Sequence, residues 1–379
     1  MLDPRYTKLA ELLIKHSTNL QSEEHILIEA FDMPSEMLTE LIRVVQDVGG
    51  HAHVAIRDMR ILRALQANGG DAAFETWSEY DLERMKRMDA YLGMRGSHNV
   101  SEHSGINPAR QKAWGQLYMT PVHMKQRINQ TKWCVLRWPT PSMAQLAGMD
   151  TDSFEDFYFN VCTLDYGQMA EAANQLVTAM AESDQVHLQG PNETDLTFSI
   201  KDIPVRHCCG NNNIPDGEVF TAPVKDSING VIQYNTPSLY RGHSFENIKL
   251  EFKDGQIVSF DADQGAEHLK PIFDTDEGSR YVGEFAIGFN PYIKEAMKDI
   301  LFDEKIAGSL HLTPGNAYDD ACNGNKSEIH WDLVMIQRPE YGGGTISFDG
   351  EIIREDGLFV KDSLLGLNPE NLIGDACAV

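Results

Sequence analysis

Apolar residues in the first half of the chain follow two alternating patterns. Short apolar runs at residues 25–31 and 51–57 are typical of buried strands, and the segment between them has apolar side chains at helical spacing. We expect this helix to begin at a cap on Ser35 and to end at Gly49–Gly50. A strand, a helix and a second strand in this order predict a parallel sheet. The same patterns predict further strands at 88–96 and 132–139, and an amphipathic helix at 169–183.

The second half of the chain shows the two-residue alternation of antiparallel strands. Residues 186–200 are typical of a hairpin, and residues 245–263 are typical of a second hairpin with Asp254–Gly255 at its centre. Residues 342–360 form another β-rich stretch. A helical pattern returns only briefly, at residues 291–302.

The length of the chain fits two domains, because 379 residues exceed what one hydrophobic core usually serves. The change from helical to alternating apolar spacing near residues 185–190 predicts the boundary between the two domains. The sequence therefore predicts an α/β N-terminal domain with a mainly parallel sheet over residues 1–187. It predicts an α+β C-terminal domain with mostly antiparallel strands over residues 188–379.

The net charge of the chain limits the classes of partner that it can bind. Its 57 acidic and 32 basic residues give a formal net charge of −25, so nucleic acid and anionic membranes are not expected partners. No apolar run approaches the roughly 20 residues that span a bilayer, and the N-terminus lacks the pattern of a signal peptide. The six cysteines form no CxxC pair, which argues against a disulfide framework or a thiolate zinc site. We expect a cytoplasmic protein.

Metal ligands are the chemistry to look for, because no GxGxxG follows the first strand and no GxxxxGK[ST] occurs in the sequence. His330 and Asp332 stand two residues apart in an apolar segment. On a strand both side chains point to the same face and can bind one ion, with Trp331 and Leu333 on the opposite face. The same pattern also fits a half-exposed strand whose polar side chains meet water.

Three other segments strengthen the metal interpretation. Glu218 lies in a turn rich in Pro, Gly and Asn, directly before a short apolar strand. Glu284 lies between Gly283 and an apolar strand, where burial of an unpaired carboxylate is costly and a cation removes that cost. His311 is followed by Tyr318 seven residues later, although a lone histidine is more often structural. Together these groups suit two divalent ions.

These segments resemble the M29 aminopeptidases, also called aminopeptidase T or the thermophilic metalloprotease family. The resemblance covers nearly the whole chain and rests on ordered motifs: NxPxxEVFTAP, GEFAxG, DEK followed by GxxHLxxGxxY, and SxxHxD. It implies a homodimeric aminopeptidase that cleaves the N-terminal peptide bond of short peptides with two divalent ions, Zn²⁺, Co²⁺ or Mn²⁺. The metal ligands implied by the resemblance are Glu218, Glu284, His311, His330 and Asp332.

The resemblance also implies roles near the metals. Glu284 corresponds to the carboxylate shared by the two ions, and Tyr318 to the active-site tyrosine, which either stabilises an oxyanion or supports a ligand. Glu304 falls near a further acidic residue of the family site. The general base stays open between Glu304 and a ligand carboxylate that shifts its coordination. Pro314 departs from the family pattern and is expected to affect the substrate pocket more than metal binding.

Two other functions fit parts of the pattern. His311, His330 and Asp332 alone would satisfy a mononuclear Fe(II) site of a ring-cleaving dihydroxypyridine dioxygenase, a class that shares this scaffold. Such a site does not use Glu218 and Glu284 as ligands, which favours hydrolysis. A non-catalytic peptide- or metal-binding protein is the third possibility. In the first half, His51 and His53 share one strand, where we expect polar residues at a strand start rather than a second metal site.

Overall fold

The computed structural model describes residues 3–373, which divide into two compact units. The first unit contains the residues up to Thr163 together with Gly210–Ile214. The second contains Leu164–Cys209 and the chain from Pro215 onward. This division lies before the boundary expected after residue 187, because helix α9 (Tyr166–Ala181) packs on strands of the second unit. Within residues 3–373, no helix combines the length and apolar character needed to cross a membrane.

The first unit is built on a five-stranded sheet with the strand order β2-β1-β3-β4-β8, and every pair in it is parallel. Its strands are β1 (His25–Phe31), β2 (His51–Arg57), β3 (Ala90–Arg95), β4 (Lys132–Arg137) and β8 (Asn213–Ile214). The predicted parallel sheet is therefore confirmed. Helix α2 begins at Ser35 as expected, but Pro34 occupies the cap position and no side chain caps the helix.

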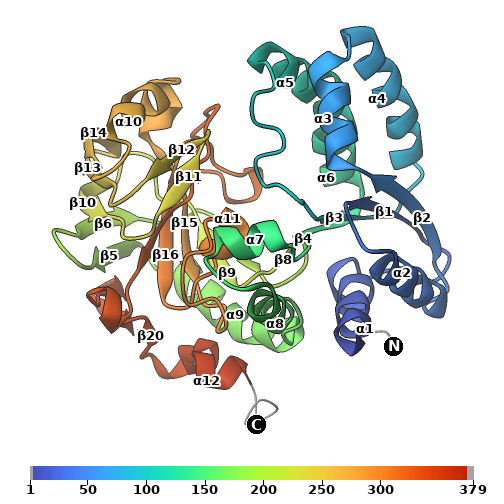
Figure 1. Ribbon diagram of the computed structural model, residues 1–379. Coiled ribbons are helices and arrows are strands. Elements are labelled where there is room, and N and C mark those ends of the chain that lie inside the picture. Colours follow the sequence, from blue (N-terminus) through green and yellow to red (C-terminus); the bar gives the residue numbers. More distant parts are fainter. Residues whose placement is uncertain (1–2, 374–379) are drawn as a thin grey trace. The chain divides into compact units, whose positions relative to one another are not determined.

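Helices cover both faces of this sheet, as in doubly wound α/β folds (Figure 1). One face carries α1 (Pro4–Glu11) and α2 (Ser35–Asp47). The other face carries α3 (Met59–Asn68), α4 (Asp71–Met85), α5 (Pro108–Trp114), the helical segment η2 (Gly115–Arg127) and α6 (Ile128–Gln130). The remaining helices of the unit are η1 (Leu12–Ser17), α7 (Pro141–Leu146) and α8 (Thr151–Cys162).

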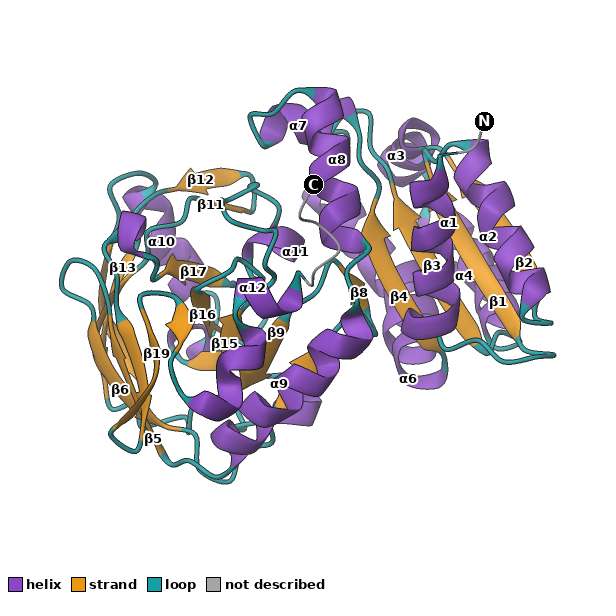
Figure 2. Ribbon diagram, turned by 90° about the horizontal axis from the view of Figure 1, so that it is seen from below, coloured by secondary structure: helices purple, strands orange, loops and turns teal. Residues whose placement is uncertain are grey.

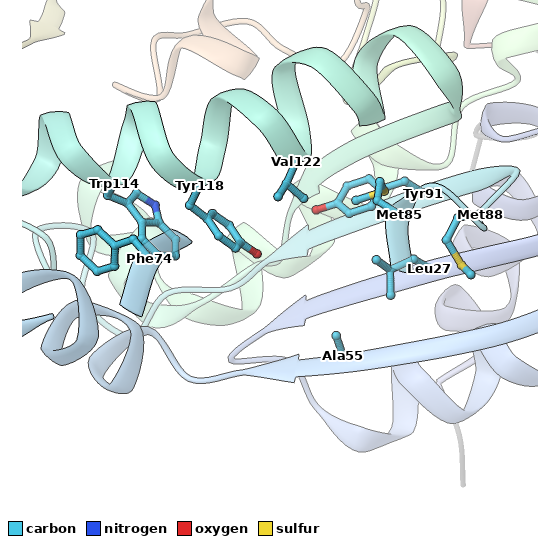
Figure 3. Packing of buried hydrophobic residues seen from close by; sticks show 9 residues of the cluster. All are labelled: Leu27, Ala55, Phe74, Met85, Met88, Tyr91, Trp114, Tyr118 and Val122. Atoms are coloured by element: carbon cyan, nitrogen blue, oxygen red, sulfur yellow. The ribbon is translucent and has the colours of Figure 1, made fainter. Parts of the chain in front are cut away.

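Aromatic side chains fill the core under this second face (Figure 3). The rings of Trp114 and Tyr118 stack with centroids 4.1 Å apart, and Phe74 meets Trp114 edge-on at 5.2 Å. Tyr91 of β3 is fully buried in the same cluster. These contacts attach α4 and η2 to the sheet, because each large ring removes much apolar surface from water.

The second unit contains two larger antiparallel sheets and a short hairpin. The eight-stranded sheet consists, in spatial order, of β14 (Gln256–Asp261), β13 (Lys249–Lys253), β10 (Asn229–Gln233), β6 (Asp195–Ser199), β5 (Gln185–Gln189), β18 (Thr345–Phe348), β19 (Glu351–Glu355) and β20 (Leu358–Phe359). Both predicted hairpins are present, as β5–β6 and β13–β14. Asp254 and Gly255 have φ values of 49° and 78° in the β13–β14 turn, which Asp-Gly pairs adopt readily.

The five-stranded sheet carries the candidate site, and its strands β9, β15, β16 and β17 lie side by side in Figure 2. Its spatial order is β17 (Leu333–Ile336), β16 (Ser309–Pro314), β15 (Val282–Gly288), β9 (Glu218–Thr221) and β7 (Arg206–Cys208). The short hairpin consists of β11 (Ser238–Tyr240) and β12 (His243–Phe245). The other helical segments are α10 (Ala266–Phe273), α12 (Pro369–Leu372), η3 (Glu277–Arg280), η4 (Asp319–Ala321), η5 (Pro339–Tyr341) and η6 (Asp362–Leu367). The predicted fold class, α/β followed by mostly antiparallel α+β, is confirmed.

The predicted helix over residues 291–302 is wrong. Only α11 (Ile300–Asp303) is helical in this segment. Lys298 has a φ of 57°, which interrupts a right-handed helix, and the backbone N–H of Met297 donates to the Asp303 carboxylate at 2.5 Å. The side chain of Asp299 then caps α11. Local side-chain hydrogen bonds thus replace the helical bonds that the apolar spacing predicted.

Candidate metal centre

Three of the five predicted ligands come from adjacent antiparallel strands. Glu218 begins β9, Glu284 lies in β15 and His311 lies in β16. In the strand register, Gly288 is opposite Glu218, and Ala286 is opposite His311. Because alternate residues of a strand share a face, the three ligand side chains point to one face of the sheet. Ala286 packs against Phe220 and Ala321 on this face.

Glu284 lies at the centre of the cluster. Its Oε1 is 3.2 Å from His311 Nε2, and its Oε2 is 3.5 Å from His330 Nε2. His311 Nε2 is also 3.8 Å from Glu218 Oε2, and His330 Nε2 is 3.2 Å from Asp332 Oδ1. The five residues therefore form two groups able to hold an ion, Glu218–Glu284–His311 and Glu284–His330–Asp332, with Glu284 in both.

His330 and Asp332 meet as the two-residue spacing predicts, although β17 itself begins only at Leu333. His330 forms an isolated bridge with Gly315, and its Nδ1 is 2.9 Å from the carbonyl oxygen of Asn316. The Thr313 hydroxyl donates to Asp332 Oδ1 at 2.7 Å. These contacts fix both ligands from behind, as second-layer hydrogen bonds do in metal sites.

Two neighbouring features explain this local geometry. A Cβ on Gly283 would lie 2.3 Å from the Asn316 carbonyl oxygen, so only glycine lets this loop approach β15 and orient His330. Trp331 points the other way, as predicted, and stacks on Tyr240 with ring centroids 4.6 Å apart. The buried tryptophan therefore anchors the segment while its two neighbours face the site.

A buried lysine that the motif analysis did not assign completes the cluster. Lys305 is fully buried, and its Nζ donates to Glu218 Oε1 at 2.8 Å, lies 3.8 Å from Asp216 Oδ1 and also contacts Glu304. Burial alone would lower the pKa of Lys305, but the charges of Glu218, Glu304 and Asp216 raise it well above its usual value. The DEK motif of the sequence already contained this lysine, directly after Asp303 and Glu304.

The turn that carries Lys305 packs directly on β15. A Cβ on Gly288 would lie 2.8 Å from the Glu304 carbonyl oxygen and 2.9 Å from the Ile306 carbonyl oxygen. Glycine at this position therefore places Glu304 and Lys305 beside the ligands. Burial raises the pKa of the Glu304 carboxyl to about 8, even though the charge of Lys305 opposes the rise.

The ligands carry strongly altered proton affinities in the absence of ions. Burial by itself lowers the pKa of His311, but its hydrogen bond to Glu284 and the charge of Glu218 outweigh burial and raise it to about 9. For His330, burial is likewise outweighed by Asp332 and Glu284, and the pKa rises to about 10. Burial opposes ionisation of Asp332, yet the His330 charge holds its pKa below the usual range. The carboxylates of Glu218, Glu284 and Asp332 therefore favour positive charge at the site, on the histidines or on bound ions.

The residues fit divalent ions. Among the residues described, Glu218 Oε2 and Glu284 Oε2 are buried side-chain oxygens without a hydrogen-bond partner, which is costly unless a cation binds there. Carboxylate and imidazole donors are those that Zn²⁺ and similar ions prefer. A third group, Cys208–Asp216–Glu218, also has ligand spacing, but the ammonium of Lys305 already pairs with both of its carboxylates.

Tyr318 and a cavity border the ligands. The Tyr318 ring lies 4.6 Å from the His330 ring and 6.0 Å from the Phe220 ring, and the residue is 48% exposed. A cavity of about 100 Å³ adjoins His330 and Asp332. The rest of its lining comes from β11 and the turn before it, from α11 and the turn before it, from Trp331 and from β17. The residues are Thr236, Pro237, Ser238, Leu239, Tyr240, Lys298, Ile300, Asp303, Trp331 and Val334.

Comparison with known proteins gives a consistent result. The family model described as thermophilic metalloprotease (M29) matches residues 2–359. Aminopeptidase 2 of Geobacillus stearothermophilus is 26% identical over 404 residues, which cover 92% of this chain and 94% of that protein. Aminopeptidase T of Thermus aquaticus is 33% identical over 198 residues, covering 45% of this chain and 46% of that protein. The chain therefore belongs to the M29 thermophilic metalloprotease family, as the ordered motifs predict.

Solved structures share the fold. AmpT from Thermus thermophilus superimposes with a TM-score of 0.79 at 21% identity, covering 95% of this chain and 100% of that chain. The 2,5-dihydroxypyridine dioxygenase from Pseudomonas putida KT2440 superimposes with a TM-score of 0.61 at 14% identity, covering 95% of this chain and 98% of that chain. At these identities the similarity establishes the architecture, and the chemistry has to be argued from the residues of the site.

Proposed function

We propose that this chain is a metal-dependent aminopeptidase that hydrolyses the N-terminal peptide bond of short peptides at a centre for two divalent ions. The observation that carries the proposal is the position of Glu284, whose two carboxylate oxygens face two different histidines. Membership of a metalloprotease family whose relatives include aminopeptidases 2 and T supports the same conclusion.

The proposed ligands divide between the two ions. Glu218 and His311 would hold one ion, His330 and Asp332 the other, and Glu284 both. Zn²⁺, Co²⁺ or Mn²⁺ suit these donors, and the bound ions supply an activated water and a polarised carbonyl. One of the ions would also accept the neutral α-amine of the substrate as a nitrogen ligand, which would account for a preference for N-terminal residues.

Two residues beside the ligands have proposed roles in the reaction. Glu304 is the proposed proton acceptor for the attacking water, because its carboxyl lies beside the ligand Glu218, where both contact Lys305. The hydroxyl of Tyr318, whose ring adjoins His330, would donate a hydrogen bond to the oxyanion that develops on the scissile carbonyl.

The cavity next to His330 is the proposed binding site for a substrate side chain. Leu239, Ile300 and Val334 contribute apolar groups to its lining, while Lys298 adds a cation. A volume of about 100 Å³ suits a side chain of moderate size rather than a folded protein segment. Short peptides with an aliphatic residue beside the cleaved bond are therefore the proposed substrates.

The main alternative is oxygen-dependent ring cleavage with a single ferrous ion, which the shared fold with the dioxygenase allows. It would use His311, His330 and Asp332 and leave the buried Glu218 and Glu284 without a function at the metal. A non-catalytic peptide- or metal-binding protein is a further alternative. A homodimer and a cytoplasmic location stay predictions.

The decisive experiment combines metal content with activity. The protein is saturated with Zn²⁺, Co²⁺ or Mn²⁺, freed of excess ion, and assayed with a panel of aminoacyl amides and dipeptides. We expect the wild type to bind two more ions than a variant that lacks Glu218, Glu284 and His330 together. We also expect hydrolysis to depend on these two ions. One ion with cleavage of a dihydroxypyridine ring under Fe²⁺ and oxygen would replace the proposal, and bound metal without any turnover would favour the non-catalytic alternative.

A further inference from the structure

Three histidines meet at the beginning of β1 and β2 in the first unit. His25 and His51 are the first residues of these strands and are paired in the parallel register. His53 follows two residues later, on the same face of β2 as His51. The His25 ring lies near both neighbours, with centroid distances of 4.7 Å to His51 and 5.2 Å to His53.

The ring nitrogens of His25 and His53 face each other. His25 Nδ1 is 2.9 Å from His53 Nε2, so in the absence of an ion the N–H of one imidazole donates a hydrogen bond to the ring nitrogen of the other. Two nitrogens bound to one tetrahedral zinc at about 2.05 Å lie roughly 3.3 Å apart, so a small opening of this contact admits an ion. The acidic group nearest the cluster by ion-pair distance is Glu23, whose Oε2 is 3.5 Å from His51 Nε2.

Other contacts keep these rings available as ligands. The carboxylate of Asp89 accepts from the backbone N–H of His25, which fixes the start of β1 without occupying its ring. Burial, together with the charges of His25, His51 and Arg84, lowers the pKa of His53. A neutral imidazole has the lone pair that a metal requires. The His51 side chain is 47% exposed and can therefore turn toward an ion held by the other two.

We propose that His25, His51 and His53 form an additional transition-metal site, separate from the Glu284 centre, which takes one borderline divalent ion such as Zn²⁺, Ni²⁺ or Cu²⁺. Imidazole is the preferred ligand of these ions, and the carboxylate of Glu23 or a water completes the coordination. The ion ties the edge strand β2 to β1 and stabilises the first unit by an amount that grows with the free metal concentration.

The test measures zinc content in the full-length protein. The wild type and a His25→Gln/His53→Gln variant are equilibrated with excess Zn²⁺, gel-filtered, and analysed for zinc per chain. We expect the variant to contain one ion fewer than the wild type. Equal zinc contents overturn the proposal. Because the result is a difference between variants, it does not depend on how many ions the Glu284 centre holds or on whether the protein is an aminopeptidase.

Two controls make the zinc measurement specific. His98→Gln removes an exposed histidine of the same unit outside the cluster and should retain the wild-type zinc content. Loss of an ion in this variant as well would assign the effect to nonspecific surface binding and overturn the proposal. The single variant His51→Gln, at a partly exposed position that tolerates the change, should bind zinc more weakly in competition with a chromophoric chelator. It should also show a smaller zinc-induced rise in Tm than the wild type; an unchanged affinity and Tm shift would exclude His51 as a ligand.

Discussion

Lys305 donates a hydrogen bond to Oε1 of Glu218 at 2.8 Å, while Oε2 of the same carboxylate faces His311. The lysine therefore occupies one oxygen of this proposed ligand and leaves the other for a metal. It also lies against Asp216 and Glu304, so a single buried cation contacts three carboxyl groups. A positive charge already fixed at this edge of the cluster favours an ion on the His311 side of Glu218 rather than beside Cys208.

Replacement of Lys305 by methionine should destabilise the metal-free protein. The variant leaves Glu218, Glu304 and Asp216 buried without their shared cation, and loss of one partner of a buried ion pair costs about 3–5 kcal/mol. Urea unfolding in the presence of a chelator measures this change in the free energy of unfolding. The matched control is Lys326→Met, which removes an exposed pair with Asp319. Equal stability of the two variants would contradict the structural role of Lys305.

Replacement of Glu284 by glutamine should remove the charge that holds two ions close together. We expect one ion per chain to be lost from the centre and kcat to fall by at least about a hundredfold, the loss typical when a charge-stabilising group leaves an active site. The fold should persist, because the substitution keeps the size of the side chain. Metal analysis and peptide hydrolysis check this outcome, and wild-type activity would refute the assignment of Glu284.

Glu304→Gln tests the proposed proton acceptor, and its metal content and kcat are compared with those of Glu284→Gln. We expect kcat to fall by roughly 10²- to 10⁴-fold, the range typical of general acid–base catalysis, while both ions remain bound. Metal loss in this variant would instead make Glu304 a ligand. Undiminished kcat would leave a shifting ligand carboxylate as the base.

Tyr318→Phe separates a role in the transition state from support of a ligand. Loss of one hydrogen bond to the oxyanion should lower kcat and kcat/KM together by about a hundredfold to a thousandfold, with KM and metal content nearly unchanged. The measurement is kcat at rising metal concentration for both proteins. Full recovery of the variant in excess metal would show that the hydroxyl supports a ligand instead.

Asp303 should make the stability of the metal-free protein depend on pH. Burial raises the pKa of this carboxyl to about 8, whereas its ordinary value is 3.8. The stabilising contribution of the neutral acid is therefore complete below about pH 4 and is lost as the pH rises toward 8. Asp303→Asn cannot ionise, so its advantage over the wild type should grow by on the order of 5 kcal/mol across this range.

The corresponding measurement is urea unfolding of both proteins at several pH values with a chelator present. The asparagine retains an oxygen that accepts from Met297, so the local hydrogen bond is preserved. A stability difference that does not change with pH would mean that the Asp303 carboxyl ionises as easily in the folded chain as in the unfolded one.

Several features follow from the sequence because they depend on local chemistry. The two-residue alternation predicted the antiparallel hairpins, and the strand–helix–strand order predicted the parallel sheet. The ordered motifs selected the five candidate ligands, which the fold does bring together. The helix expected over residues 291–302 failed because apolar spacing takes no account of the Asp303 carboxylate that binds the Met297 amide.

Other features depend on distances that no local pattern contains. Lys305 and Glu218 are 87 residues apart in the chain, and His25 and His53 are 28 apart, yet each pair is in hydrogen-bonding contact. The sequence by itself predicted five residues that could bind a metal. Only the tertiary structure decided that Lys305 pairs with Asp216 and Glu218. It also decided that His25 lies beside His51 and His53. The physical reason is that ion pairing and coordination depend on separations of a few ångströms, which are set by strand register and by the glycines that let chains approach.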